Sequence, residues 1–230
     1  MTVPVPTLTR ERALYKTGAE FVIGCDEVGR GAIAGPVAVG LCGVSAKIRK
    51  VPEGLRDSKL LAEKRRVELS PVVQDWSLFS AVGLASNDEI DELGLTVALG
   101  LAGSRALEVL LSQGIDVSNA VVLLDGKFDW FTPAVARMDP MIRPINLPVS
   151  MRIKADQDCA SVSGASVVAK VHRDTIMIER HEDHPHYAWR GNKGYASSEH
   201  YAAIDRVGPS DFHRRTWLRA PSTALELDFE

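Results

Sequence analysis

Carboxylates end apolar segments in three separate parts of the chain. Asp26 and Glu27 close the run "FVIGCDE", Asp125 closes "VVLLD", and Asp156 lies in "IKADQD". In an open α/β sheet ligands bind beyond the strand ends, so these segments can bring their acids to one edge of one sheet. Mg²⁺ is held in proteins by a few carboxylates together with waters and substrate phosphates. The spacing of the acids therefore indicates a divalent-cation site.

Each acid also has an ordinary structural explanation. Asp26 can cap a helix or turn, Asp125 can form a turn before Gly126, and Asp156 can be the N-cap of the helix that follows it. For one acid alone this explanation is at least as good as metal binding. For all of them together it is weaker, because each interrupts an apolar segment in which an unpaired charge is costly to bury.

The glycine-rich stretch "GCDEVGRG" has a different use from the phosphate loop that it partly resembles. Arg30 and Gly31 stand where the pattern GxxxxGK[ST] needs lysine and a hydroxyl residue, and the two acids inside the loop would repel a triphosphate. The segment Gly29–Gly31 can instead bring bare backbone N–H and C=O groups close to a sugar-phosphate chain, with Arg30 available to a phosphate. We expect a backbone-reading loop beside the metal site.

Strands and helices alternate along the chain in a way that can position these residues. Strands are predicted at residues 20–26, 36–44, 76–84, 119–126 and 143–151, the last at an edge or with a bulge because of Pro148. Helices are predicted at 62–76 with a disturbance at Pro71, at 87–113 with a break near Gly94, at 159–180 and at 197–207. Three early strands followed by strand and helix in alternation predict a mixed sheet with helices on both faces.

Asp26 and Glu27 are neighbours in the first predicted strand. In a regular strand their side chains point to opposite faces of the sheet. For both to reach a metal, we expect the strand to end or bulge at this point.

The composition is that of a soluble globular protein rather than of a membrane or disulfide-bonded protein. The chain has 230 residues, of which 45% are hydrophobic and 25% charged, enough to bury a sizeable core. No uninterrupted membrane span and no secretory signal are visible, which predicts a cytoplasmic protein. Cys25, Cys42 and Cys159 form no CxxC pair, so any metal is held by oxygen or imidazole. The net charge of −3 does not exclude a local basic face for nucleic acid.

Five stretches together resemble bacterial ribonuclease HII, the type 2 ribonuclease H, in order and over nearly the whole chain. They are "GCDEVGRGAIAGPVAVG", "LRDSKLLAEKRR", "VVLLDG", "KADQDCASVSGASVVAKVHRD" and "GYASSEHYAAIDRVGPSDFHRRTW". The resemblance implies an α/β fold of the RNase H-like type, with a mixed five-stranded sheet flanked by helices and a C-terminal helical segment. It also implies endonucleolytic cleavage of RNA in RNA·DNA hybrids and at single ribonucleotides embedded in duplex DNA.

The resemblance further assigns roles to residues of this sequence by matching position. The catalytic and metal-binding acids implied are Asp26, Glu27, Asp125 and Asp156. The implied substrate-binding residues are Gly29, Arg30 and Gly31 for the ribose, Ser58 and Lys59 for a phosphate, and Tyr195 for the neighbouring sugar. Without the resemblance, Tyr195 reads as a partly buried loop tyrosine. Gly94, Gly164 and the segment "RIKAD" depart from the residues common in the family, and none of these departures removes an acid.

The implied reaction is two-metal hydrolysis with Mg²⁺ or Mn²⁺. In such sites paired cations about 3.5–4 Å apart stabilise the attacking and leaving oxygens of an in-line displacement at phosphorus. The expected products carry a 5′-phosphate and a 3′-hydroxyl. The 2′-OH distinguishes RNA from DNA, and the backbone of Gly29–Gly31 is a suitable partner for it. Two alternatives remain: a structure-selective DNase of the same fold, and a non-catalytic hybrid-binding protein.

The end of the chain carries basic residues and then an acidic tail. Arg214, Arg215 and Arg219 are expected to face nucleic acid while Trp217 packs. We divide the chain into an N-terminal helical extension (1–20), a catalytic domain (21–220) and a disordered acidic tail (221–230), and expect a monomer. In the tail, Leu227 and Phe229 are spaced as in the QxxLxF peptide that docks on the bacterial sliding clamp, with Ala224 in place of the glutamine. A weak clamp contact is therefore predicted.

Overall fold

The structure is a computed structural model that describes residues 5–48, 50–141, 143 and 147–219. It contains one five-stranded sheet in the order β3-β2-β1-β4-β5. The strands are β1 (Phe21–Val28), β2 (Val37–Ser45), β3 (Phe79–Ala85), β4 (Ala120–Asp125) and β5 (Val149–Arg152). β1, β2 and β3 form antiparallel pairs, and β4 and β5 continue the sheet in parallel with β1. This is the predicted mixed sheet.

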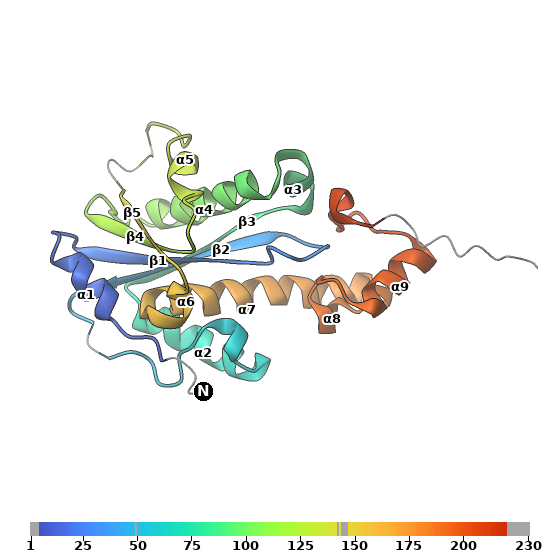
Figure 1. The fold of residues 1–230 in the computed structure, drawn as a ribbon, viewed down its shortest axis with the longest axis horizontal. Helices are drawn as coiled ribbons and strands as arrows, with labels where there is room; N and C mark the ends of the chain where they lie inside the picture. The colour runs from blue at the N-terminus through green and yellow to red at the C-terminus, as the bar shows by residue number, and fades with distance from the viewer. Residues whose placement is uncertain (1–4, 49, 142, 144–146, 220–230) are drawn as a thin grey trace, which may run out of the picture.

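Helices cover both faces of the sheet (Figure 1). One face carries α3 (Asn87–Leu93), α4 (Leu95–Ser112) and α5 (Phe131–Val135). The other face carries α1 (Thr9–Tyr15), α2 (Glu63–Trp76), α6 (Ala155–Asp158) and the long α7 (Ala160–Asp183). The C-terminal half of α7 extends past the sheet toward α8 (Trp189–Asn192) and α9 (Ser198–Val207). Short 3-10 turns lie at Ser58–Leu60, Pro185–Tyr187 and Arg215–Trp217.

The main core lies between the sheet and α4. Ile23, Cys25 and Leu124 of the sheet meet Leu99 and Leu107 of α4 there. By length and apolar composition, α4 could cross a membrane, the only helix of the described part that could, with a mean hydropathy of 1.4 over 18 residues. However, half of it is buried inside the fold. Its apolar character is therefore explained by packing on the sheet.

α7 packs directly on the opposite face because small residues let the two backbones approach. A Cβ atom at Gly24 of β1 would overlap the backbone of Ser161 in α7, so only glycine fits at this position. Ala165 and Ala169 meet Gly40 of β2 in the same way. These small residues bring α7 close to the strand that carries Asp26.

The break predicted near Gly94 is confirmed, and the disturbance predicted at Pro71 is wrong. Gly94 separates α3 from α4 with φ +77°, in the left-handed region. α2 runs through Pro71 without interruption from Glu63 to Trp76. Proline removes one helical hydrogen bond, but Leu69 and Val73 on either side are buried against α7, and this packing keeps the helix continuous.

β5 is shorter than predicted. It has four residues and begins after Pro148, whose carbonyl accepts a hydrogen bond from Val122 at 2.9 Å. β5 is an edge strand, as the proline indicated.

α1 lies within the predicted N-terminal extension and is attached to the catalytic domain by Glu11. This carboxylate is fully buried and accepts hydrogen bonds from the Ser161 amide at 2.9 Å and hydroxyl at 2.8 Å, at the start of α7. The domain boundaries at residues 20 and 220 stay a prediction, and the predicted acidic tail lies outside the described residues.

Candidate active site

The parallel strands β1 and β4 bring two of the acids together. Cys25 pairs with Leu124, so the next residues along the two strands, Asp26 and Asp125, are neighbours at the sheet edge. Both belong to the face that α7 covers, because side chains alternate along a strand and Gly24 contacts that helix. The expected convergence of two strand ends follows from the register of the sheet.

Glu27 reaches the same edge without the predicted end or bulge in β1, so that prediction is wrong. The ladder with β2 is regular through Val28, with Glu27 opposite Val39. Pairing with β4 stops at Cys25, however, and this leaves Glu27 beyond the end of the neighbouring strand. Its Oε1 accepts a hydrogen bond from Arg30 at 3.2 Å, and its side chain is 14% exposed. Termination of one neighbour, rather than distortion of β1, opens the site.

Asp156 comes from the turn between β5 and α7. Lys154 adopts a left-handed conformation with φ +61°, and the one-turn helix α6 follows it. The backbone N–H of Ala155 donates to Oδ1 of Asp125 at 2.7 Å, which joins this turn to the end of β4. Asp156 itself is 4% exposed. Three chain segments thus meet at what we call the acid edge, formed by Asp26, Glu27, Asp125 and Asp156.

Burial and the repulsion of neighbouring carboxylates disfavour the charged forms of Asp26 and Asp125. Burial, followed by the charge of Glu27, raises the pKa of Asp26 well above its ordinary value. Burial and then the charge of Asp156 raise the pKa of Asp125 to about 6. Burial alone would lower the pKa of Lys59, but the charges of Asp26, Asp57 and Asp156 outweigh it and raise that pKa. A cation bound at the acid edge would relieve the repulsion between its carboxylates.

The donor set fits a hard divalent cation. One oxygen each of Asp26 and Glu27 is buried without a hydrogen-bond partner among the described residues. Only carboxylate oxygens are offered, as Mg²⁺ and Mn²⁺ prefer. Within the described ranges no three His, Cys, Asp or Glu side chains stand close enough to hold an ion as they lie. Lys59 Nζ lies 3.3 Å from Oδ2 of Asp156 and neutralises part of the negative charge of the acid edge.

The segment Gly29–Gly31, the sugar-reading loop of the sequence prediction, lies next to the acid edge. Gly29 has φ +86°, and a Cβ atom there would overlap the guanidinium of Arg173, so glycine is required. A Cβ atom at Gly31 would meet nothing within 4 Å. Among the described residues, the N–H of Gly31 has no hydrogen-bond partner, whereas its C=O lies opposite the N–H of Ala196 in the β-bridge between Ala32 and Tyr195. The loop presents open space and a free N–H at its second glycine.

Two buried arginines bind backbone carbonyls in and next to this loop. Sequence reasoning missed Arg173 and predicted the wrong position for Arg214. Arg173 of α7 donates to the carbonyls of Ala34, Pro36 and Lys193. Arg214 donates to the carbonyls of Gly29, Arg30 and Gly35. Both are 0% exposed.

The prediction that Arg214 faces nucleic acid is therefore wrong, because its guanidinium is buried and donates to three loop carbonyls. Arg215 and Arg219 are exposed, and Arg219 forms an ion pair with Asp205 at 3.0 Å. Trp217 is partly buried against the α4 core, as expected.

The segment Asp57–Lys59 lies on the other side of the acids. Lys59 is directed at Asp156, while the Ser58 hydroxyl is buried and lies 2.8 Å from the Ser166 hydroxyl. Ser166 in turn lowers the pKa of Asp26, against the effect of burial. Sequence reasoning missed Ser166, for which no local pattern gave a signal. Ser58 thus contacts the acid edge through a second serine.

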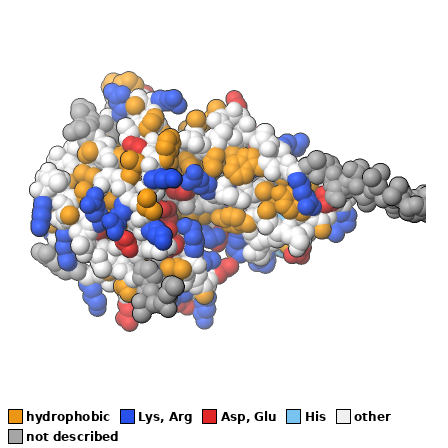
Figure 2. Space-filling view, in the orientation of Figure 1, with side chains coloured by type: hydrophobic (Ala, Val, Ile, Leu, Met, Phe, Trp, Pro, Cys, Tyr) orange, Lys and Arg blue, Asp and Glu red, His pale blue; other side chains and the backbone are white. Residues whose placement is uncertain are grey.

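Tyr195 lies beside the loop. It forms a β-bridge with Ala32, and its ring lies 5.4 Å from the Arg173 guanidinium carbon and 5.7 Å from Lys170 Nζ. The residue is half-buried. In the same orientation as Figure 1, Figure 2 shows acidic side chains in the middle of the molecule with basic side chains around them. A polyanion that reaches the acids would meet these cations.

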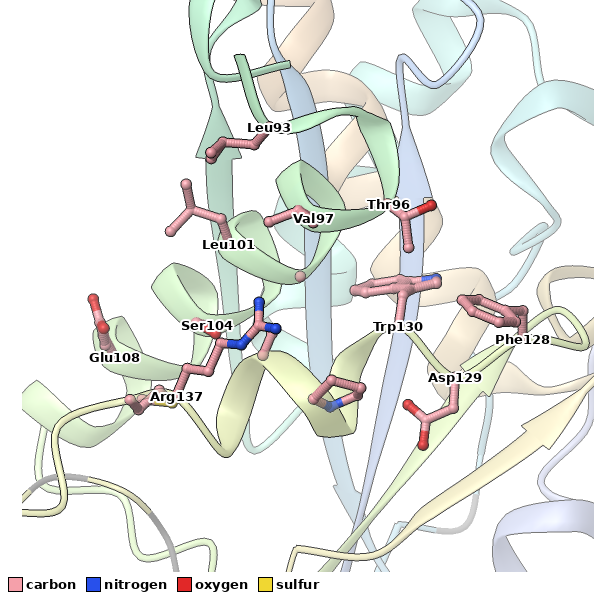
Figure 3. Close-up of a pocket in the computed structure, with 14 residues that line it drawn as sticks. Leu93, Thr96, Val97, Leu101, Ser104, Glu108, Phe128, Asp129, Trp130 and Arg137 are labelled. Carbon is pink, nitrogen blue, oxygen red and sulfur yellow. The ribbon is translucent and has the colours of Figure 1, made fainter. Parts of the chain in front are cut away.

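A separate apolar groove lies between α4 and α5 (Figure 3). It has a volume of about 310 Å³ and is lined mainly by apolar side chains, among them Leu93, Val97, Leu101, Phe128 and Trp130. Its charged lining residues Glu108, Asp129 and Arg137 do not belong to the acid edge. The groove is therefore a concave surface that lacks the cluster of carboxylates needed for the predicted reaction.

A mixed five-stranded sheet whose edge gathers carboxylates, flanked by a glycine loop and basic side chains, defines a nuclease of the RNase H-like class. Among solved structures, ribonuclease H2 from Pyrococcus horikoshii OT3 is similar with a TM-score of 0.67 and 25% identity, covering 86% of this chain and 93% of that chain. The RNase HII of a PCNA:RNase HII complex from Archaeoglobus fulgidus (TM-score 0.63, 22% identity, 85% and 93% covered) and Bst-RNase HIII in complex with Mn²⁺ (TM-score 0.63, 24% identity, 84% and 63% covered) share the fold.

Residues 23–220 match the family Ribonuclease HII. A ribonuclease HII from Streptomyces griseus is 46% identical over 218 residues, covering 92% of this chain and 84% of that protein. A ribonuclease HII from Caulobacter vibrioides is 38% identical and covers 98% and 99%. The chain belongs to the ribonuclease HII family. The predictions of the fold and of a type 2 ribonuclease H, an endoribonuclease, are confirmed at this level.

Proposed function

We propose that the protein cleaves the RNA strand of RNA·DNA hybrids and the 5′ side of single ribonucleotides in duplex DNA, leaving 5′-phosphate and 3′-hydroxyl ends. The observation that carries this proposal is the meeting of acids from three chain segments beside a glycine loop with a free backbone N–H. Cleavage needs the acids, and recognition of ribose needs the loop.

Asp26, Glu27, Asp125 and Asp156 would hold two divalent cations, Mg²⁺ or Mn²⁺. The buried oxygens of Asp26 and Glu27 that lack partners support this role. When bound, the cations would supply activation of the attacking water and neutralise charge on the leaving 3′-oxygen. When a cation binds Asp156, Lys59 would move from this carboxylate toward a substrate phosphate. Its side chain is free to do so because it is 64% exposed.

The loop Gly29–Gly31 would recognise the 2′-OH through its backbone. A hydroxyl both donates and accepts, so the free N–H of Gly31 can donate a hydrogen bond to it. A site built around such a hydroxyl can reject the analogue without it by about 10⁴–10⁵. Arg30, whose side chain is 62% exposed, would contact a phosphate after leaving Glu27.

Tyr195 would stack on the deoxyribose that follows a single ribonucleotide. Its ring is supported on one side by cations of α7, which supports a fixed orientation. Ser58 would act on the phosphate side by its backbone, since its hydroxyl is engaged with Ser166.

One assay tests the proposal. The protein is incubated with Mg²⁺ and three duplexes: all-DNA, RNA·DNA, and DNA with one ribonucleotide. We expect cleavage of the last two alone, with 5′-phosphate ends. Cleavage of all three would support the structure-selective DNase, and binding without cleavage would support the hybrid-binding protein. Omission of divalent cations should stop cleavage while the fold, followed by circular dichroism, is retained.

We also propose a weak contact between the C-terminal tail and a sliding clamp. Leu227 and Phe229 provide two apolar anchors, and a relative of the same fold is known in complex with PCNA. Titration of a labelled clamp with the full chain and with its Leu227→Ser/Phe229→Ser variant tests this. Equal binding by both, or binding by neither, would contradict it. The monomeric state and the cytoplasmic location stay predictions.

A further inference from the structure

Asp174 of α7 is a buried carboxylate that lies outside the acid edge. It is 4% exposed and separated from Ser166 by eight residues of helix, about 12 Å along its axis. Two cations from different elements face it. Lys170 Nζ lies 2.5 Å from its Oδ1, and Arg66 Nη2 of α2 lies 3.7 Å from its Oδ2. Removal of one member of such a buried group leaves the others uncompensated.

Arg66 connects this carboxylate to the phosphate side of the site. Its Nη1 donates to the carbonyl of Ser58 at 3.1 Å and to that of Leu61 at 2.5 Å. These carbonyls bracket the turn that carries Lys59, the side chain directed at Asp156. The position of the Arg66 guanidinium therefore sets the position of this turn.

Lys170 connects the same carboxylate to the sugar side. Its Nζ lies 5.7 Å from the ring centroid of Tyr195, next to the guanidinium of Arg173. Lys170 is held at a side-chain exposure of 14%, so it has little room to choose another partner. Tyr195 is thus supported by a cation whose own place depends on Asp174.

We propose that Asp174 is a positioning residue that sets the turn of Lys59 and the ring of Tyr195 together, and so determines selectivity for a single embedded ribonucleotide. This inference rests on the proposed role of Tyr195. Without the carboxylate, Lys170 and Arg66 are two buried like charges that repel each other. Both would move, and with them the contacts on either side of the scissile bond. A long hybrid offers no deoxyribose there and depends less on the arrangement.

The test compares kcat/KM for a duplex with one ribonucleotide and for an RNA·DNA hybrid. For Asp174→Asn we expect the ratio of the two to fall about tenfold, within the range of coupling energies between contacting residues. Asp174→Glu should restore part of the ratio. Asp205→Asn is the matched control. It removes a carboxylate of α9 that forms an ion pair with Arg219, and the ratio of the two kcat/KM values should be unchanged. If Asp174→Asn does not fold, Lys170→Met should lower the ratio in its place.

The double variant Asp174→Asn/Tyr195→Ala separates positioning from general destabilisation. We expect its ratio to equal that of Tyr195→Ala alone, because the turn of Lys59 serves a phosphate of either substrate and only the ring distinguishes the two substrates. Equal losses on both substrates for Asp174→Asn, or additive effects in the double variant, would overturn the inference and leave the role of Tyr195 intact. An unchanged ratio for Tyr195→Ala itself would overturn both.

Discussion

The acid edge and the apolar groove differ in charge and in shape. The groove between α4 and α5 is a well-formed cavity with few polar groups (Figure 3). The acid edge has buried charges, raised pKa values and oxygens without partners. Hydrolysis of a phosphodiester needs concentrated negative charge to hold cations, whereas an apolar cavity supplies none. In this protein charge, and not concavity, marks the region that we propose to be reactive.

The largest difference between the two regions is expected when one acid in each is neutralised and cleavage is measured. Asp125→Asn should lower cleavage by at least about 10³-fold, because it removes an oxygen donor from the centre of the acid edge. Glu108→Gln, which neutralises an acid of the groove, should change cleavage less than about twofold. Rates are measured at saturating Mg²⁺ on the single-ribonucleotide duplex. Asp26→Asn should behave as Asp125→Asn does, and near wild-type turnover by either would refute the role of the edge.

A change beside the acids, at the ring that we propose contacts the sugar, sharpens the comparison. Tyr195→Ala should impair cleavage at a single ribonucleotide about tenfold more than cleavage within long RNA, since stacking is worth about 1–3 kcal/mol. Only the first substrate places a deoxyribose next to the scissile bond. Competition between the two labelled substrates in one reaction gives the ratio directly. Parallel losses would show that Tyr195 does not sense the junction.

The pH dependence of stability also distinguishes the two regions. The pKa of Asp125 is raised from its ordinary value to about 6, so the folded metal-free protein binds a proton there more readily than the unfolded chain does. Its contribution to stability therefore falls as pH rises from about 4 to about 6. Protonation also competes with cations, so Mg²⁺ binding should weaken as pH falls below about 6.

The measurement is the thermal midpoint of the metal-free protein at pH 5 and pH 7. We expect Asp125→Asn to raise the midpoint more at pH 7 than at pH 5 by a few degrees, since the substitution removes repulsion that is present above the raised pKa. Glu108→Gln is the control and should show no such difference. A lower midpoint for Asp125→Asn at pH 7 would contradict the assignment of repulsion to this edge.

The smallest effect is expected from the groove. Val97→Ser alters an α4 side chain that is 42% exposed, so it should leave cleavage within about twofold and cost less than about 1 kcal/mol. Activity and urea unfolding of the same preparation check both numbers. A tenfold loss of cleavage at unchanged stability would show that the groove takes part in the reaction.

Local patterns were sufficient for most elements and for the acids. Apolar runs that end in Asp26 and Asp125 predicted two strands with reactive ends, and both strands are present. Gly94 predicted the break between α3 and α4, because glycine alone readily takes a positive φ. Pro71 misled, since its local cost is smaller than the packing of Leu69 and Val73.

Long-range contacts decided the rest. Nothing local distinguishes Arg214, which is buried on loop carbonyls, from the exposed Arg215 beside it. Nothing local shows that Asp174 would face cations of two elements, or that Ser166 would lie between Ser58 and Asp26.

The sequence by itself determined the order of the strands and the long helices and the family to which the chain belongs, and it predicted the chemical kind of the site. The tertiary structure alone decided how Glu27 reaches the edge: β1 stays regularly paired with β2 while its pairing with β4 stops. It also decided which cations point inward. Periodicity and turn chemistry act over a few residues, whereas the length of a neighbouring strand and the burial of a charge depend on segments more than a hundred residues away, as for Arg214 and Gly29.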